Sequence, residues 1–210
     1  MNLPNKITLI RIVLIPFFLA AFMLREYTDW LVYVSAGLFV LASVTDFLDG
    51  HIARKYNMVT DMGKFLDPIA DKVLVAAALF LVLGYALIPP MWGVIFVTVI
   101  IGREFAVSAL RQVAATRGKV IAADKIGKVK TAVTLVALTA MLVAKPLDWM
   151  IRKSGGGNVV PDGSLFITYG TFQWIGFCLL AAAVLLTLVS GVHYIVKNRE
   201  VFREDKGIEN

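Results

Sequence analysis

Six apolar stretches dominate this sequence, and each approaches the roughly 20 residues that a helix needs to cross a bilayer. With approximate ends, they are Ile7–Leu24, Leu31–Arg54, Phe65–Ile88, Met91–Ala115, Ile126–Ala144 and Ile167–Val196. Only 17% of the 210 residues are charged, whereas a soluble helical bundle of this length needs far more polar surface. We therefore predict an all-α integral membrane protein with six transmembrane helices that form one domain, residues 1–210.

The lysines and arginines predict the orientation of these helices. Of the 21 such residues, 17 lie on the side that holds both chain termini and 4 lie on the other side. Because cytoplasmic loops carry the excess of positive charge, we predict that both termini are cytoplasmic. The same rule accounts for the formal charge of +6, which therefore does not indicate a nucleic-acid partner.

Two pairs of aspartates interrupt the apolar pattern. Asp46 and Asp49 are three residues apart, and Asp67 and Asp71 are four apart, so each pair shares one face of its helix. At ~1.5 Å per residue, both pairs reach a similar depth just inside the cytoplasmic side. Such carboxylates repel one another in a low dielectric, so either basic neighbours such as Arg54 neutralise them or they bind divalent cations. We favour the second interpretation and predict two metal ions that clamp a transferring phosphate.

The residues around these aspartates form a longer pattern. It reads Asp46-x-x-Asp49-Gly50-x-x-Ala53-Arg54, then eight residues, then Gly63-x-x-x-Asp67-x-x-x-Asp71. This pattern resembles the signature of the CDP-alcohol phosphatidyltransferase family. The resemblance covers the whole chain and implies that family's fold, in which six helices span the plasma membrane, the active site faces the cytoplasm and two copies form a homodimer.

The resemblance also implies a role for each signature residue. The four aspartates would hold two divalent ions, Mg²⁺ or Mn²⁺, and Asp71 would also be the general base. CDP-diacylglycerol would be bound through its nucleotide and diphosphate by Asp46, Asp49, Gly50, Ala53, Arg54, Gly63 and Asp67. The implied reaction is attack of an alcohol oxygen on the lipid-side phosphorus, with CMP as the leaving group.

Three further segments bear on the identity of the alcohol. They are Asn2–Ile12, Gly102–Arg111 and Ile126–Thr134, and all three resemble those of family members that use glycerol 3-phosphate. The expected product is then phosphatidylglycerol phosphate. Two alternatives stay open: another acceptor, such as inositol phosphate or phosphatidylglycerol, and a membrane transporter that uses intramembrane acids for ion coupling.

A phosphorylated acceptor is a dianion and would need a basic pocket. We predict that Arg103 and Arg111, which are eight residues apart, bind it together with Lys128 and Thr131, which share a helix face. The alternative for these basic residues is the ordinary excess of positive charge on the cytoplasmic side, together with attraction to anionic lipid.

The first apolar stretch carries one polar face. Asn5, Thr8 and Arg11 recur about every turn of the predicted helix. They could border the acceptor pocket, or Arg11 could extend its charge to the membrane surface; the sequence favours neither.

Overall fold

The computed structural model describes residues 3–28, 30–55, 61–116, 121, 125–154 and 170–199. Within these ranges the chain is all-helical and contains no β-strand. The helices are α1 (Leu3–Met23), the short 3-10 helix η1 (Leu24–Glu26), α2 (Leu31–Lys55), α3 (Asp61–Gly84), α4 (Pro90–Thr116), α5 (Lys125–Ser154) and α6 (Thr171–Lys197). The predicted all-α class is confirmed for this part of the chain, and each predicted apolar stretch falls on one α-helix.

Three helical segments in the described ranges are long and apolar enough to cross a membrane. They are Pro90–Thr116, Ile126–Ala144 and Thr171–Lys197. Large apolar side chains on these helices, such as Leu185 and Val189, are mostly exposed, as expected where hydrocarbon instead of water surrounds a helix. Shorter apolar stretches lie in the other three helices, at Leu9–Met23, Leu31–Thr45 and Lys72–Gly84.

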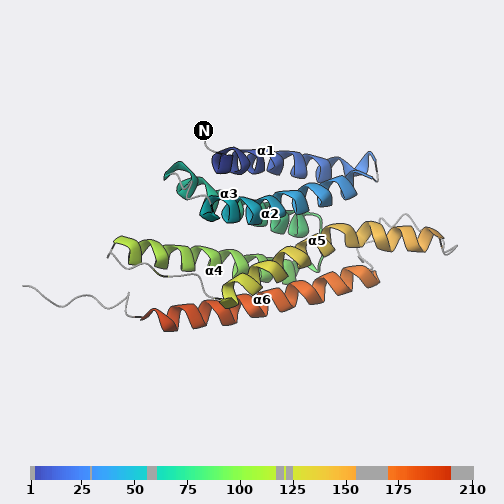
Figure 1. Cartoon of the computed structure of the whole chain (residues 1–210). Coiled ribbons are helices and arrows are strands. Elements are labelled where there is room, and N and C mark those ends of the chain that lie inside the picture. Colours follow the sequence, from blue (N-terminus) through green and yellow to red (C-terminus); the bar gives the residue numbers. More distant parts are fainter. Residues whose placement is uncertain are drawn as a thin grey trace, which may run out of the picture.

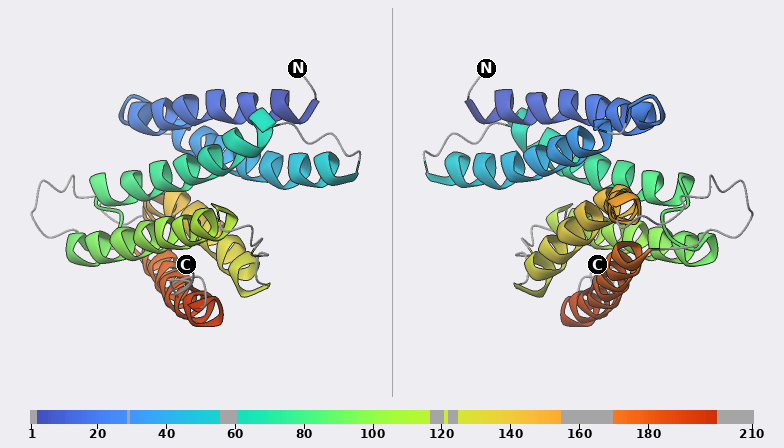
Figure 2. Two further views of the ribbon diagram at one scale, coloured as in Figure 1. Left: turned by 90° about the vertical axis from the view of Figure 1, so that its left-hand side faces the viewer. Right: turned by 90° about the vertical axis from the view of Figure 1, so that its right-hand side faces the viewer.

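The helices pack into two groups that share one core. α1 lies against α2 and α3, and α6 lies against α4 and α5, while α2 contacts α5 and α3 contacts both α4 and α5 (Figures 1 and 2). Each of the six α-helices contributes buried apolar side chains to this core, among them Phe18, Phe39, Leu79, Ile100, Leu138 and Leu180. α3 therefore has the aspartate-bearing α2 on one side and the basic α4 and α5 on the other.

A glycine sets the close approach of α5 and α6. A Cβ added at Gly176 would collide with the sulfur of Met141 and lie 3.5 Å from the Met141 Cα atom. The backbones of the two helices therefore come together at this level, and a larger residue would push them apart.

The end of α3 differs from its prediction, because the helix stops four residues before Ile88. Leu87 N–H donates to Val82 O at 3.0 Å, and Ala86 N–H donates to Leu83 O at 3.1 Å. Ala86 has a φ of 47°, so the helix closes with a left-handed residue in a Schellman motif. The predicted break before the next helix is confirmed, since α4 begins at Pro90. Proline suits the first position of a helix, because the N–H that it lacks would have no hydrogen-bond partner within the helix there.

The two ends of the bundle differ in chemistry. Trp30, Trp92 and Trp174 lie where α2, α4 and α6 begin, and all three are exposed. The start of α3 and the ends of α2, α4 and α6 lie at the opposite end, on the left in Figure 1. The signature aspartates belong to that second end.

Candidate active site

The four signature aspartates lie near the joined ends of two packed helices. Asp46 and Asp49 are about 14 and 9 Å before the end of α2, and Asp67 and Asp71 are about 9 and 15 Å after the start of α3, at ~1.5 Å per residue. α2 and α3 contact each other. The fold therefore brings both pairs to the same end of the bundle.

The side chains of the signature residues lie outside the described part of the structure, although their helices are described. Their chemistry is that of cation ligands, because four carboxylates on adjacent helices supply the oxygen atoms that hard divalent cations prefer. The residues present thus fit two such ions. Elsewhere, no group of three or more described His, Cys, Asp or Glu side chains could hold a metal.

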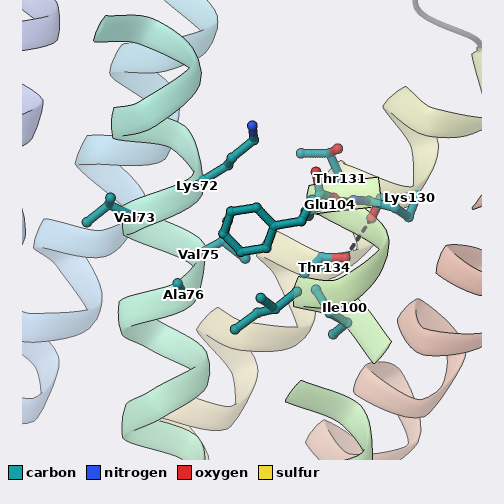
Figure 3. Close-up of a pocket in the computed structure, with 11 residues that line it drawn as sticks. Lys72, Val73, Val75, Ala76, Ile100, Glu104, Lys130, Thr131 and Thr134 are labelled. Atoms are coloured by element: carbon teal, nitrogen blue, oxygen red, sulfur yellow. Dashed lines mark hydrogen bonds and ion pairs between the residues drawn. The ribbon is translucent and has the colours of Figure 1, made fainter. Parts of the chain in front are cut away.

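A cavity of about 140 Å³ lies between α3, α4 and α5. Its polar side chains are Lys72, Glu104, Lys130, Thr131 and Thr134. Apolar residues form the rest of the wall, and they are Val73, Val75, Ala76, Ile100, Ile101 and Phe105. Figure 3 shows Lys72 reaching from α3 toward the side where the polar groups of α4 and α5 gather.

The cavity adjoins the aspartate-bearing segment of α3. Lys72 directly follows Asp71, and Val75 comes one helical turn after it. A small molecule in this cavity would therefore be close to the helix that carries the predicted base. Of the predicted acceptor residues, Thr131 lines the cavity, and its hydroxyl donates to Gly127 O at 3.0 Å.

Arg103 is directed to α6 and does not line the cavity. Its Nη2 donates to Ser190 Oγ at 3.0 Å, and its Nη1 lies 3.4 Å from Glu104 Oε1. A Cβ added at Gly191 would lie 2.9 Å from Arg103 Cγ, so the side chain crosses α6 where α6 has no side chain of its own. Arg103 therefore connects α4 with α6.

Arg111 is held by an aromatic residue of α6. Its Nε donates to the Tyr194 hydroxyl at 2.9 Å, and its guanidinium carbon is 5.3 Å from the centre of the same ring. Tyr194 is buried in a small cluster with Val107, Leu110 and Ala114. The arginine itself is exposed, so its position is fixed from one side while its charge remains accessible.

The other predicted acceptor residues are placed as follows. Lys128 is exposed and does not line the cavity. Arg11 is fully buried, which disfavours the interpretation in which its charge extends to the surface. Asn5 and Thr8 belong to α1, and their side chains lie outside the described residues.

Sequence reasoning missed most of the polar wall of the cavity. Lys72, Glu104, Lys130 and Thr134 were not predicted as site residues, yet all four line it. One signal was present, since Thr134 lies four residues after Lys130 and three after Thr131 and so shares a helix face with each.

Comparison with known proteins settles the family. The family model of the CDP-alcohol phosphatidyltransferases matches residues 1–189. The chain belongs to this family. Among its relatives, the CDP-diacylglycerol–glycerol-3-phosphate 3-phosphatidyltransferase of Bacillus subtilis is 41% identical over 214 residues, which cover 96% of this chain and 97% of the relative. Proteins of the same name from Salmonella typhimurium and Escherichia coli are 38% and 37% identical over 196 residues, or 92% of this chain and 93% of each relative.

Membership confirms the resemblance first drawn from the aspartate pattern. In this CDP-alcohol phosphatidyltransferase, the matched region includes the described parts of α1 to α5 and most of α6, which ends at Lys197. The signature helices and all three walls of the cavity therefore lie within the family region.

Proposed function

We propose that this chain transfers the phosphatidyl group of CDP-diacylglycerol to glycerol 3-phosphate, giving phosphatidylglycerol phosphate and CMP. The observation that carries the proposal is the similarity to the Bacillus subtilis enzyme, which extends over 97% of that enzyme at 41% identity. The reaction supplies a precursor of phosphatidylglycerol, so the chain functions in phospholipid synthesis.

The proposed setting is the plasma membrane, with six spans, cytoplasmic termini and a homodimer. The excess of lysine and arginine on the side that holds the termini supports this orientation. The exposed tryptophans at the other end of the bundle support the membrane setting, because such residues favour the membrane interface. The aspartates would then face the cytoplasm, where CMP and glycerol 3-phosphate are soluble, while the acyl chains of the substrate stay in the bilayer.

The proposed chemistry is a direct displacement. Asp71 removes the proton from the acceptor hydroxyl, the freed oxygen forms a bond to the lipid-side phosphorus, and the bond from that phosphorus to CMP breaks. Asp46, Asp49, Asp67 and Asp71 would hold two divalent ions, Mg²⁺ or Mn²⁺. When bound, the ions neutralise charge on the transferring and leaving groups.

The remaining signature residues would bind the nucleotide substrate. Arg54 can form charge-assisted hydrogen bonds to the diphosphate. Gly50, Ala53 and Gly63 have little or no side chain, so the substrate can approach the helix backbone closely. The acceptor would enter the cavity on the other side of α3.

One experiment tests this function and its alternatives together. The purified protein in lipid bilayers is given CDP-diacylglycerol with glycerol 3-phosphate, inositol phosphate or phosphatidylglycerol, and CMP release is measured. We expect fast release with glycerol 3-phosphate only. Faster release with another acceptor would reassign the substrate, and no release with any of them would support a transporter.

Arg111 and Lys128 remain proposed contacts of the acceptor phosphate. A hydrogen bond to a charged group contributes ~1.5–3 kcal/mol, so Arg111→Ala or Lys128→Ala should raise the KM for glycerol 3-phosphate by roughly tenfold to a hundredfold. We expect the lower end of this range, because both residues are exposed and solvent screens their charge.

The KM for CDP-diacylglycerol should change much less in these variants, and Gln112→Ala, an exposed neighbour of Arg111 on α4, is the matched control. Both KM values are measured for each variant. A rise in the KM for CDP-diacylglycerol alone would instead assign Arg111 and Lys128 to the nucleotide or to the lipid surface.

A further inference from the structure

A buried ion pair forms the polar side of the cavity. Lys130 Nζ on α5 donates to Glu104 Oε1 on α4, and Figure 3 shows the pair beside Thr131 and Thr134. The Lys130 side chain is only 4% exposed, whereas that of Glu104 is 29% exposed. The ammonium group is therefore enclosed by protein at a place where a ligand can reach it.

A gain in folding stability does not by itself explain a buried pair of charges such as Glu104 and Lys130. Removing two charges from water costs several kcal/mol per ion, and well-packed apolar residues of similar size are often at least as stabilising. Most of the cavity wall is apolar, as shown by Val75, Ile100 and Phe105. A charged pair within this wall is thus better explained by a polar ligand than by packing.

The carboxylate of Glu104 is itself fixed from a second direction. Arg103 Nη1 lies 3.4 Å from Glu104 Oε1, and Arg103 Nη2 is bound to Ser190 Oγ on α6. Ser190 Oγ in turn donates to Thr187 O at 3.1 Å. Glu104 is therefore held by α6 through Arg103, and it holds Lys130 on α5.

The cavity has the size and place of an acceptor site. Its volume of about 140 Å³ is below the ~300–1,000 Å³ typical of sites for larger ligands, which suits a small alcohol better than a nucleotide. It adjoins Asp71 through Lys72. A fixed positive charge in surroundings of low polarity also attracts an anion more strongly than the same charge in water does.

We propose that Lys130 contacts the phosphate of the acceptor inside this cavity and that Glu104 is the positioning residue that holds Lys130 there. This assignment rests on the proposed function, and it adds an inner cation to the exposed Arg111 and Lys128. Arg103 acts one step further away, by fixing Glu104.

The test compares Lys130→Met, Glu104→Gln and the double variant Lys130→Met/Glu104→Leu with the wild type. In Lys130→Met, the KM for glycerol 3-phosphate should rise roughly tenfold to a hundredfold, with little change in the KM for CDP-diacylglycerol. Glu104→Gln should raise the same KM by a smaller factor, because the ammonium group is present but less well held. Lys130→Arg should restore part of the affinity.

The double variant separates binding from folding. It removes both charges of the Glu104–Lys130 pair, and Arg103 keeps its hydrogen bond to Ser190 Oγ. The protein should therefore fold and elute as the wild type does, yet its KM for glycerol 3-phosphate should remain high. A wild-type KM in the double variant would show that the pair only stabilises the fold and would overturn the proposal. A rise of both KM values by the same factor in Lys130→Met would overturn it as well.

Val129→Ala is the matched control, because Val129 directly precedes Lys130 on α5, is 54% exposed and does not line the cavity. Its KM for glycerol 3-phosphate should stay near that of the wild type, and a rise equal to that of Lys130→Met would contradict the assignment to Lys130. Failure of the proposed function is distinguishable, because the wild type itself would then release no CMP in response to glycerol 3-phosphate.

Discussion

Asp71→Asn is expected to lower kcat by about 10²–10⁴-fold while CDP-diacylglycerol still binds. Asparagine has nearly the same shape as aspartate but cannot accept the proton of the acceptor hydroxyl. The other three signature aspartates and Arg54 remain available to bind the diphosphate. The measurement is kcat under saturation with both substrates, together with binding of labelled CDP-diacylglycerol.

Asp61→Asn provides the control, because Asp61 also lies on α3 but belongs to the eight-residue spacer between Arg54 and Gly63, which holds no signature residue. That variant should keep wild-type turnover. Turnover near that of the wild type in Asp71→Asn would remove Asp71 from the proton-transfer step.

Exhaustive treatment with EDTA should abolish activity, and added Mg²⁺ or Mn²⁺ should restore it. Four carboxylates on α2 and α3 need divalent cations to balance their charge around a diphosphate. The measurement is CMP release before chelation, after chelation and after each metal is added back. Gel filtration of the chelated protein shows whether the fold is retained, so that loss of metal is distinguished from unfolding. Full activity in the chelated protein would defeat the two-metal hypothesis.

The helices were largely predictable from sequence, because a long apolar run can satisfy its backbone groups in a membrane only as a helix. Their ends were less predictable. α3 stops early because Ala86 adopts a left-handed conformation, which alanine does not signal in the way glycine does. α5 runs ten residues past the predicted Ala144, through Pro146 to Ser154, because a helix does not have to end where its apolar stretch ends.

The aspartates and the cavity wall also differed in how far the sequence alone could predict them. The aspartates could be singled out as a candidate site because their spacing along single helices is a local property. The cavity wall depends on how α5 is rotated against α4 and α6, which only tertiary packing decides. The spacing of Lys128 and Thr131 suggested that both face the acceptor, but the packed helix exposes Lys128 and turns Lys130 toward Glu104.

The crossing of Arg103 over α6 also has an evolutionary meaning. A methyl group at position 191 would lie 2.9 Å from the Arg103 Cγ atom, which is near the root of the side chain and cannot move away as its tip could. Gly191 and Arg103 therefore constrain each other although they lie on different helices, so we expect a side chain at position 191 to be tolerated only together with a smaller residue at position 103.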